Sequence, residues 1–112
     1  MTAAEVEACC LALPGAHKVR LWGRVDVYKL TNKVFCTCSE ADGVSFKASD
    51  ILYSILTESG PGRKARGFTP GAWVAVPLAE ADAEETAGWI AQSHGYAAAA
   101  LTRKARAELG LT

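Results

Sequence analysis

The stretch VDVYKLTNKVFCTCSEADGVSFKA, residues 25–48, decides the fold. It holds three short segments rich in β-branched and aromatic residues, at 25–30, 33–39 and 43–48. The residues between them, Thr31-Asn32 and Ala41-Asp42-Gly43, suit hairpin connections. Neighbouring strands joined by tight turns pair antiparallel, so the stretch predicts an antiparallel meander. The composition of residues 18–22 predicts one more strand before the meander.

Segments with helical periodicity flank the meander. Residues 3–12 predict a helix with Thr2 as N-cap, and residues 50–59 predict another with Ser49 as N-cap and Gly60 at its end. WVAVPL at 73–78 predicts a further strand.

The last part of the chain predicts two helices. One begins at Asp82 with an acidic first turn, which favours the positive end of the helix dipole. We expect His94-Gly95 to break it, and a final helix to cover residues 96–109. The order predicts an α+β fold: a two-layer sandwich in which helices cover one face of an antiparallel sheet.

Length and composition fit one globular unit. The chain has 112 residues, of which 50% are hydrophobic and 21% charged, so we expect a single domain over 1–112. The start, MTAAEVEACCLAL, lacks the basic residues and long apolar run of a signal peptide. No stretch approaches the roughly 20 apolar residues of a membrane helix. We therefore expect a cytoplasmic protein, with no membrane role and with reduced thiols.

The cysteines do not have the spacing of a metal site. Structural zinc sites place two cysteines two to four residues apart in a tight turn. Here Cys36 and Cys38 share one face of a predicted strand, while Cys9 and Cys10 point apart on a helix. The pattern favours small buried hydrophobes, and we expect no metal and no cofactor.

No catalytic constellation is visible either. There is no Cys-x-x-Cys pair, the two histidines, His17 and His94, are far apart, and each is expected at the surface or as a cap. The acids at 80–85 suit a solvated helix start. The sequence therefore predicts a protein that is not an enzyme.

The segment GPGRKARGFTPGAW, residues 60–73, has three basic residues and no acid. Its glycine spacing is that of a P-loop, but Phe68-Thr69 stands where Lys-Ser/Thr is required, and a helix precedes it where a strand should. We read it as a helix-to-strand connection that presents a basic patch, with Phe68 and Trp73 near enough to stack on a ligand. In one register Lys29 and Lys47 leave the sheet toward the same patch. The predicted nucleic-acid contacts are Lys29, Lys47, Arg63, Lys64, Arg66 and Trp73.

The order of short landmarks resembles the MmcQ/YjbR family over nearly the whole chain. The landmarks are Leu13-Pro14-Gly15, Trp22-Gly23, Val27-Tyr28-Lys29-Leu30, Lys33-Val34-Phe35, Val44-Ser45-Phe46-Lys47, Trp73-Val74-Ala75-Val76 and the closing Leu101-x-Arg103-Lys104-x-Arg106. The resemblance implies a CyaY-like (frataxin-like) fold and a bacterial DNA-binding protein.

This chain departs from the family where the polar loop before the tryptophan is expected. It has Gly67-Phe68-Thr69-Pro70-Gly71-Ala72-Trp73 in place of a stretch with His, Asn and Lys, and its basic charge lies earlier. The iron role of frataxin-like proteins is not carried over, because the first helix has only Glu5 and Glu7.

The sequence thus leaves two main functional hypotheses; a third, an enzyme or small-ligand binder, rests only on a pocket between the sheet and the closing helix and has no residue pattern in support. The first is a non-enzymatic protein that binds the phosphates of double-stranded DNA through the basic glycine-rich loop. Its net charge of zero means that binding must depend on a local patch. The alternative is a protein-protein interaction module, a homodimer or a regulatory partner, without a nucleic-acid role.

Overall fold

A computed structural model describes residues 1–66 and 71–111. Its centre is a six-stranded antiparallel sheet in the order β1-β2-β3-β4-β6-β5. The strands are β1 (His17–Leu21), β2 (Val25–Leu30), β3 (Lys33–Ser39), β4 (Gly43–Lys47), β5 (Arg63–Lys64) and β6 (Trp73–Val76). The meander expected from residues 25–48 is confirmed as β2, β3 and β4, and the strand before it as β1.

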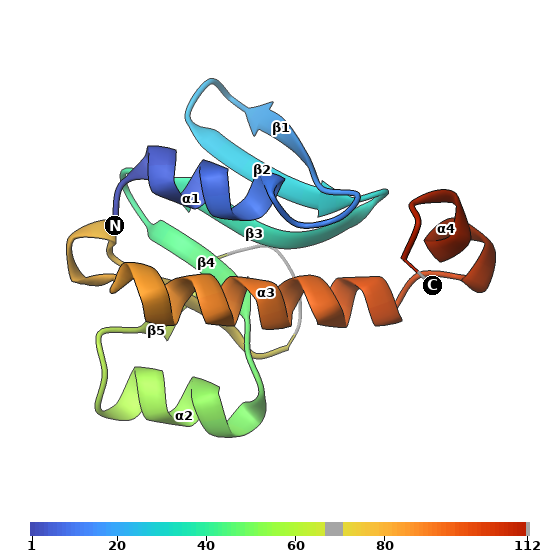
Figure 1. Cartoon of the computed structure of the whole chain (residues 1–112). Coiled ribbons are helices and arrows are strands. Elements are labelled where there is room, and N and C mark those ends of the chain that lie inside the picture. The colour runs from blue at the N-terminus through green and yellow to red at the C-terminus, as the bar shows by residue number, and fades with distance from the viewer. Residues whose placement is uncertain (67–70, 112) are drawn as a thin grey trace.

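Helices form the second layer. They are α1 (Ala3–Leu11), α2 (Asp50–Glu58), α3 (Ala83–Ala99) and α4 (Arg103–Glu108), with a short 3-10 turn, η1 (Leu78–Glu80), before α3. Figure 1 shows α1 and α3 crossing in front of the strands and α2 lying beside the β5 and β6 edge. The expected α+β sandwich, with helices on one face of an antiparallel sheet, is confirmed. Among the described residues no helix is long and apolar enough to cross a membrane.

Local capping fixes where the helices begin. The Thr2 hydroxyl accepts from the Glu5 N–H, and the Glu5 carboxylate accepts from the Thr2 N–H, which completes the expected capping box. Ser49 and Asp82 cap α2 and α3 in the same way, through the N–H groups three residues on.

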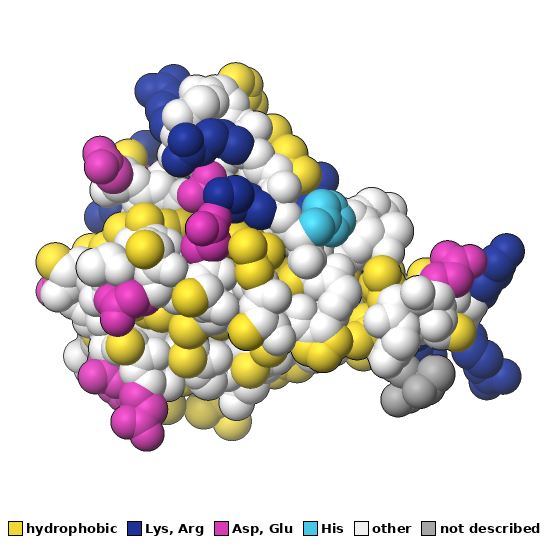
Figure 2. Space-filling model, turned by 45° about the horizontal axis from the view of Figure 1, so that its top comes forward, with side chains coloured by type: hydrophobic (Ala, Val, Ile, Leu, Met, Phe, Trp, Pro, Cys, Tyr) yellow, Lys and Arg dark blue, Asp and Glu magenta, His cyan; other side chains and the backbone are white. Residues whose placement is uncertain are grey.

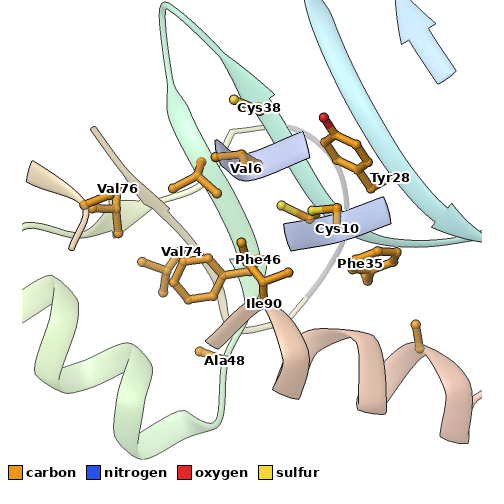
Figure 3. Close-up of a cluster of buried hydrophobic side chains, with 14 of the residues drawn as sticks. Val6, Cys10, Tyr28, Phe35, Cys38, Phe46, Ala48, Val74, Val76 and Ile90 are labelled. Atoms are coloured by element: carbon orange, nitrogen blue, oxygen red, sulfur yellow. The ribbon is translucent and has the colours of Figure 1, made fainter. Parts of the chain in front are cut away.

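The core fills the space between the sheet and the helices (Figure 3). Tyr28, Cys36, Phe46 and Val74 form one row across β2, β3, β4 and β6, because the register pairs each with the next. All four are buried, and Ile90 of α3 lies against them in the same cluster. The face that carries this row is therefore the face that the helices cover.

The opposite face, which we call the outer face, carries the alternate residues of the same strands. Val27, Thr37, Ser45 and Ala75 form its central row, and Arg63 of β5 pairs with Ala75 at the end. The first four are buried, although none belongs to the hydrophobic cluster under the helices. Both sides of the central strands are thus withdrawn from solvent.

The expected break at His94-Gly95 is wrong, because α3 continues through it to Ala99. His94 is buried: its Nε2 lies 2.9 Å from the Pro14 carbonyl oxygen, and its ring meets Phe35 edge-on at 5.3 Å. A glycine in a helix costs only about 1 kcal/mol, and these contacts outweigh it. The chain turns instead at residues 100–102, where Thr102 caps α4.

The segment 60–73 also holds an element that its composition does not predict. Arg63 and Lys64 pair with Ala75 and Val74, so the expected connection includes the edge strand β5. Gly67, Phe68, Thr69 and Pro70 lie outside the described residues, and with them the stacking role expected of Phe68.

Alanine substitutions at two glycines should change the stability of the fold in opposite directions. Gly43 has φ +82°, and a Cβ there would lie 2.1 Å from the Val76 carbonyl oxygen, so Gly43→Ala should destabilise the fold by about 3 kcal/mol or more. Gly95 is exposed within α3 with nothing within 4 Å of an added Cβ. Gly95→Ala should therefore stabilise it by about 1 kcal/mol.

Urea unfolding of both variants beside the wild type measures these changes. A destabilised Gly95→Ala protein would contradict the continuous α3.

Candidate functional site

The register brings two of the predicted cationic residues, Lys29 and Arg63, onto the outer face. Tyr28 points to the helices, so Lys29, one residue further along β2, points the other way. Arg63 joins it because its partner Ala75 alternates with Val74. Lys47 follows Phe46 at the end of β4, but its Nζ lies 6.0 Å from the centre of the Tyr96 ring, so its ammonium group lies beside α3.

The basic residues of segment 63–66 lie at two positions along the sheet. Lys64 is an exposed residue of the edge strand β5. The Arg63 guanidinium donates to the Ala41 carbonyl oxygen at 3.4 Å, and Arg66 Nε lies 3.6 Å from Asp42 Oδ1. Both arginines therefore reach the β3–β4 turn, at the opposite end of β4 from Lys47. The predicted contacts thus lie at separate places and not in a single cluster: Lys29 and Arg63 on the outer face, Lys64 on the edge strand opposite Val74, and Lys47 beside α3.

A β-bulge and one hydroxyl group fix the backbone at Lys47. Between β2 and β3 the register slips: Tyr28 pairs with Cys36 and Lys29 with Val34, so Phe35 is the extra residue. The Ser93 hydroxyl, from α3, donates to the Phe35 carbonyl at 2.6 Å and accepts from the Lys47 N–H at 3.0 Å. Ser93 is 1% exposed, so it satisfies two backbone groups in a place that water does not reach. It joins β3, β4 and α3 at the base of the lysine.

A small cavity of about 370 Å³ opens beside Lys47. Lys33 and Lys47 supply its positive charge, and Trp73 and Tyr96 supply aromatic surface. Lys47 Nζ lies 6.0 Å from the centre of the Tyr96 ring, at the limit of a cation–π contact. Trp73 is only 6% exposed, so it supports the wall, and Tyr96, 40% exposed, is the aromatic ring open to a ligand.

Three cavity residues, Lys33, Ser93 and Tyr96, are absent from the residues predicted as contacts. The sequence places Tyr96 at the start of a separate helix, whereas the continuous α3 carries it over Lys47. The preceding Ser93-His94 pair was a sequence signal for long-range contacts, since two polar residues in a buried helix segment need hydrogen-bond partners. Which partners they find depends on the tertiary fold.

The lysines of the cavity and of the neighbouring outer face are suited to bind an anion. Within residues 1–66 and 71–111, Lys29, Lys33 and Lys47 form no ion pair with a carboxylate. Ammonium groups in solvent bind phosphate as point charges without a large desolvation cost. The cavity also offers the Ser93 and Asn32 side chains, although the Ser93 hydroxyl is already engaged.

The thiols are placed for packing and not for chemistry. Cys10, Cys36 and Cys38 are buried, as the sequence predicts. Burial raises the pKa of the Cys36 thiol well above its usual range and that of Cys38 to about 11, and burial also raises the pKa of Cys9. Neutral thiols are poor nucleophiles and poor metal ligands. In the part of the chain that the structure describes, no three His, Cys, Asp or Glu side chains gather into a possible metal site.

Comparisons with known proteins agree with this fold. The model of the YjbR family matches residues 11–95. The structure is similar to the crystal structure of Deinococcus radiodurans protein DR2400, described as a DUF419 domain, with a TM-score of 0.79 and 21% sequence identity. That match covers 99% of this chain and 89% of the other, and at this identity it supports the fold alone. None of the curated proteins matches the chain.

The Ser93 bridge can be removed with one substitution. Ser93→Ala leaves the Phe35 carbonyl and the Lys47 N–H without this partner, so we expect a loss of about 2 kcal/mol or more in unfolding free energy. Ser54→Ala, on the exposed side of α2, is the matched control and should change stability by less than about 0.5 kcal/mol. Equal unfolding midpoints for the two variants in urea would show that the bridge does not stabilise the fold.

The thiol environment predicts a clear order of alkylation. With iodoacetamide at pH 8, Cys9 should react first, because it is the only partly exposed cysteine of the four, and Cys36 should react only on unfolding. Peptide mass mapping after timed quenching gives the order. Rapid native labelling of Cys36 would contradict the buried, protonated state.

Proposed function

The chain belongs to the YjbR family, and from this premise we propose that it is a non-enzymatic protein that binds double-stranded DNA through its phosphate backbone. The observation that carries the proposal is a set of lysines on neighbouring strands that form no ion pair within the described residues: Lys33 and Lys47 at the cavity beside Tyr96, and Lys29 on the outer face. Three cations held on one rigid sheet can contact successive phosphates, because strands fix the spacing of their side chains.

The local charge supports this proposal despite a net charge of zero. Carboxylates lie elsewhere or are paired: Glu7 with Lys18, Asp26 with Arg20, and Asp42 with Arg66. Lys29, Lys33 and Lys47 therefore keep their charge for a ligand. Contacts of this kind position a duplex and carry no sequence information, so we expect binding with little sequence preference.

The arginines and the lysines contribute unequally in this proposal. Arg66 shares its charge with Asp42, although its side chain is 83% exposed, and an exposed pair of this kind is worth at most about 1 kcal/mol. A phosphate can therefore compete for Arg66. Lys47 forms no ion pair within the described residues, so a phosphate displaces no carboxylate there. Its backbone N–H is also bonded to Ser93. Lys47 is thus the stronger contact.

We propose a non-enzymatic role because the groups that could act as nucleophiles or bases are buried, already in contact with other groups, or isolated. Burial raises the pKa of the Cys36 and Cys38 thiols and so keeps them protonated, and the His94 ring is occupied by Pro14 and Phe35. His17 lies on β1, exposed to solvent. No pair of these groups is brought together as a nucleophile and its base would be.

The alternative, an interaction module, has one observation in its favour. Ile51 and Ile55 lie one turn apart on α2 and are 75% and 55% exposed. The occupant that this alternative commits to is a second copy of the chain. Sedimentation equilibrium of the wild type beside the Ile51→Lys, Ile55→Lys double variant tests it. A wild type that stays monomeric at about 100 μM, a concentration at which weak dimers form, would exclude it.

Duplex binding is measured by the anisotropy of a labelled random-sequence duplex, titrated with protein at several salt concentrations. We expect affinity to fall steeply with salt, with a log–log slope of roughly −0.9 for each phosphate neutralised. Lys29→Ala with Lys47→Ala should weaken binding at low salt and reduce the slope by about 2. Arg63→Ala with Lys64→Ala should act in the same direction by a smaller amount, because Arg63 already donates to Ala41.

The matched control is Arg103→Ala with Lys104→Ala, which removes two exposed charges from α4. It changes net charge equally and should leave the slope nearly unchanged. Equal losses in the control and in the Lys29 and Lys47 variant would remove these two lysines from the site. A wild type that binds no duplex at low salt would refute the proposal.

A further inference from the structure

The tip of the β1–β2 hairpin holds a tryptophan in a strained position. Trp22 and Gly23 have φ 52° and 69°, and the Arg24 N–H closes the turn on the Leu21 carbonyl at 3.1 Å. Positive φ at both central positions is the pattern of a type I′ turn, which favours Asn-Gly. For a bulky residue such as tryptophan, the left-handed conformation is a genuine outlier.

Burial of the Trp22 side chain does not compensate for this strain. The Trp22 side chain is 78% exposed, so its indole ring is largely unburied and contributes little to the core. Trp73, by contrast, is 6% exposed, and Trp89 stacks on Phe46. Strained and exposed residues of this kind point to a function that lies outside the folding of the chain itself.

Basic residues lie near the tip, with acidic residues among them. Lys18, Arg20 and Arg24 belong to the hairpin, and Figure 2 shows Lys and Arg side chains together with Asp and Glu side chains over this part of the molecule. Arg20 Nε lies 3.0 Å from Asp26 Oδ1 and Lys18 pairs with Glu7, whereas Arg24 forms no ion pair within the described residues. The tryptophan therefore stands two residues before an exposed cation that is open to an anion.

A large open cavity of about 850 Å³ joins this tip to the β3–β4 turn. Arg20, Gly23 and Arg24 line it together with the β3–β4 turn, and three carboxylates, Asp26, Glu40 and Asp42, also belong to its lining. Arg63 and Arg66 reach the same turn, through the Ala41 carbonyl and the Asp42 carboxylate. The hairpin tip and the turn that the two arginines reach thus border one hollow.

We propose that Trp22 is a stacking platform for an unpaired base of single-stranded nucleic acid, whose phosphate Arg24 contacts. This inference rests on the proposed function for the further phosphate contacts along the sheet. An exposed indole and an exposed guanidinium on the same tight turn match the two parts of a nucleotide, a flat base and a charged phosphate. Self-association through this tip is disfavoured, because two facing copies would bring Arg20 and Arg24 of both close together.

The decisive variant is Trp22→Asn, because the same substitution should improve the fold and remove the platform. Asn suits the turn, so the variant should unfold at an equal or higher temperature than the wild type. Its affinity for a labelled oligo(dT) should fall by roughly 5- to 150-fold, the equivalent of one lost base stack. Trp22→Phe keeps an aromatic face and should recover part of that affinity, while Arg24→Ala should weaken binding in a salt-dependent way.

A direct readout comes from the tryptophan itself. Oligo(dT) should quench the emission that Trp22 contributes, and the quenching should be absent in Trp22→Asn, where the less exposed Trp73 and Trp89 remain. Oligo(dT) bound with equal affinity by the wild type and Trp22→Asn would overturn the inference. So would a dimer that forms without nucleic acid and is lost in Trp22→Asn.

Duplex binding measured beside oligo(dT) separates this inference from the proposed function. Duplex bound without oligo(dT) overturns the role of Trp22 and leaves the lysine contacts in place. Oligo(dT) bound through Trp22 without any duplex binding supports the platform and overturns the duplex proposal. Binding of neither ligand at low salt overturns both.

Discussion

The alternation of side chains along paired strands is the constraint on which the rest of the structure depends. Burial of Tyr28, Cys36, Phe46 and Val74 under the helices sets the register of four strands at once. A slip by one residue would exchange the two faces of a strand and place a lysine in the core, at a cost of several kcal/mol. The hydrophobic row on one face therefore dictates that Lys29 lies on the other and that Lys47 leaves the end of β4, so the proposed contacts are placed by the same register that forms the core.

The one irregularity in this sheet lies beside the candidate site. The bulge at Phe35 interrupts the ladder between β2 and β3, and the Ser93 hydroxyl bonds to Phe35 and to Lys47 there. Bulges leave a backbone group unpaired, and inside a protein such a group needs a partner. Because that partner comes from α3, the helix is tied to the end of β4, and Tyr96 one turn later comes close to Lys47. Packing and the shape of the cavity thus have the same origin.

The pairing of charged residues decides which cations are available to a ligand. Twelve basic and twelve acidic residues cancel in sum, yet three carboxylates are engaged by Lys18, Arg20 and Arg66, and Lys29, Lys33 and Lys47 form no ion pair within the described residues. A neutral chain can therefore present a positive surface without a global excess that would destabilise the compact state. At the hairpin tip, the strained Trp22 adds an apolar element next to Arg24. The two features together suggest a surface that meets phosphates along the sheet and a base at its edge.

The sequence by itself determined the elements that depend on local chemistry. Turn residues at 31–32 and 41–43 and β-branched runs between them specify the meander, and Thr2, Ser49 and Asp82 specify where helices start, because caps and turns involve residues only a few positions apart. The family resemblance follows from the same landmarks. Only the tertiary structure decided that α3 runs on through His94-Gly95, since the contacts of His94 with Pro14 and Phe35 come from distant parts of the chain. It also decided the pairing of β5, the reach of Arg63 and Arg66 to the β3–β4 turn, and the exposure of Trp22. These features depend on long-range contacts and register, whose energies are set by burial and by partners that no local pattern identifies.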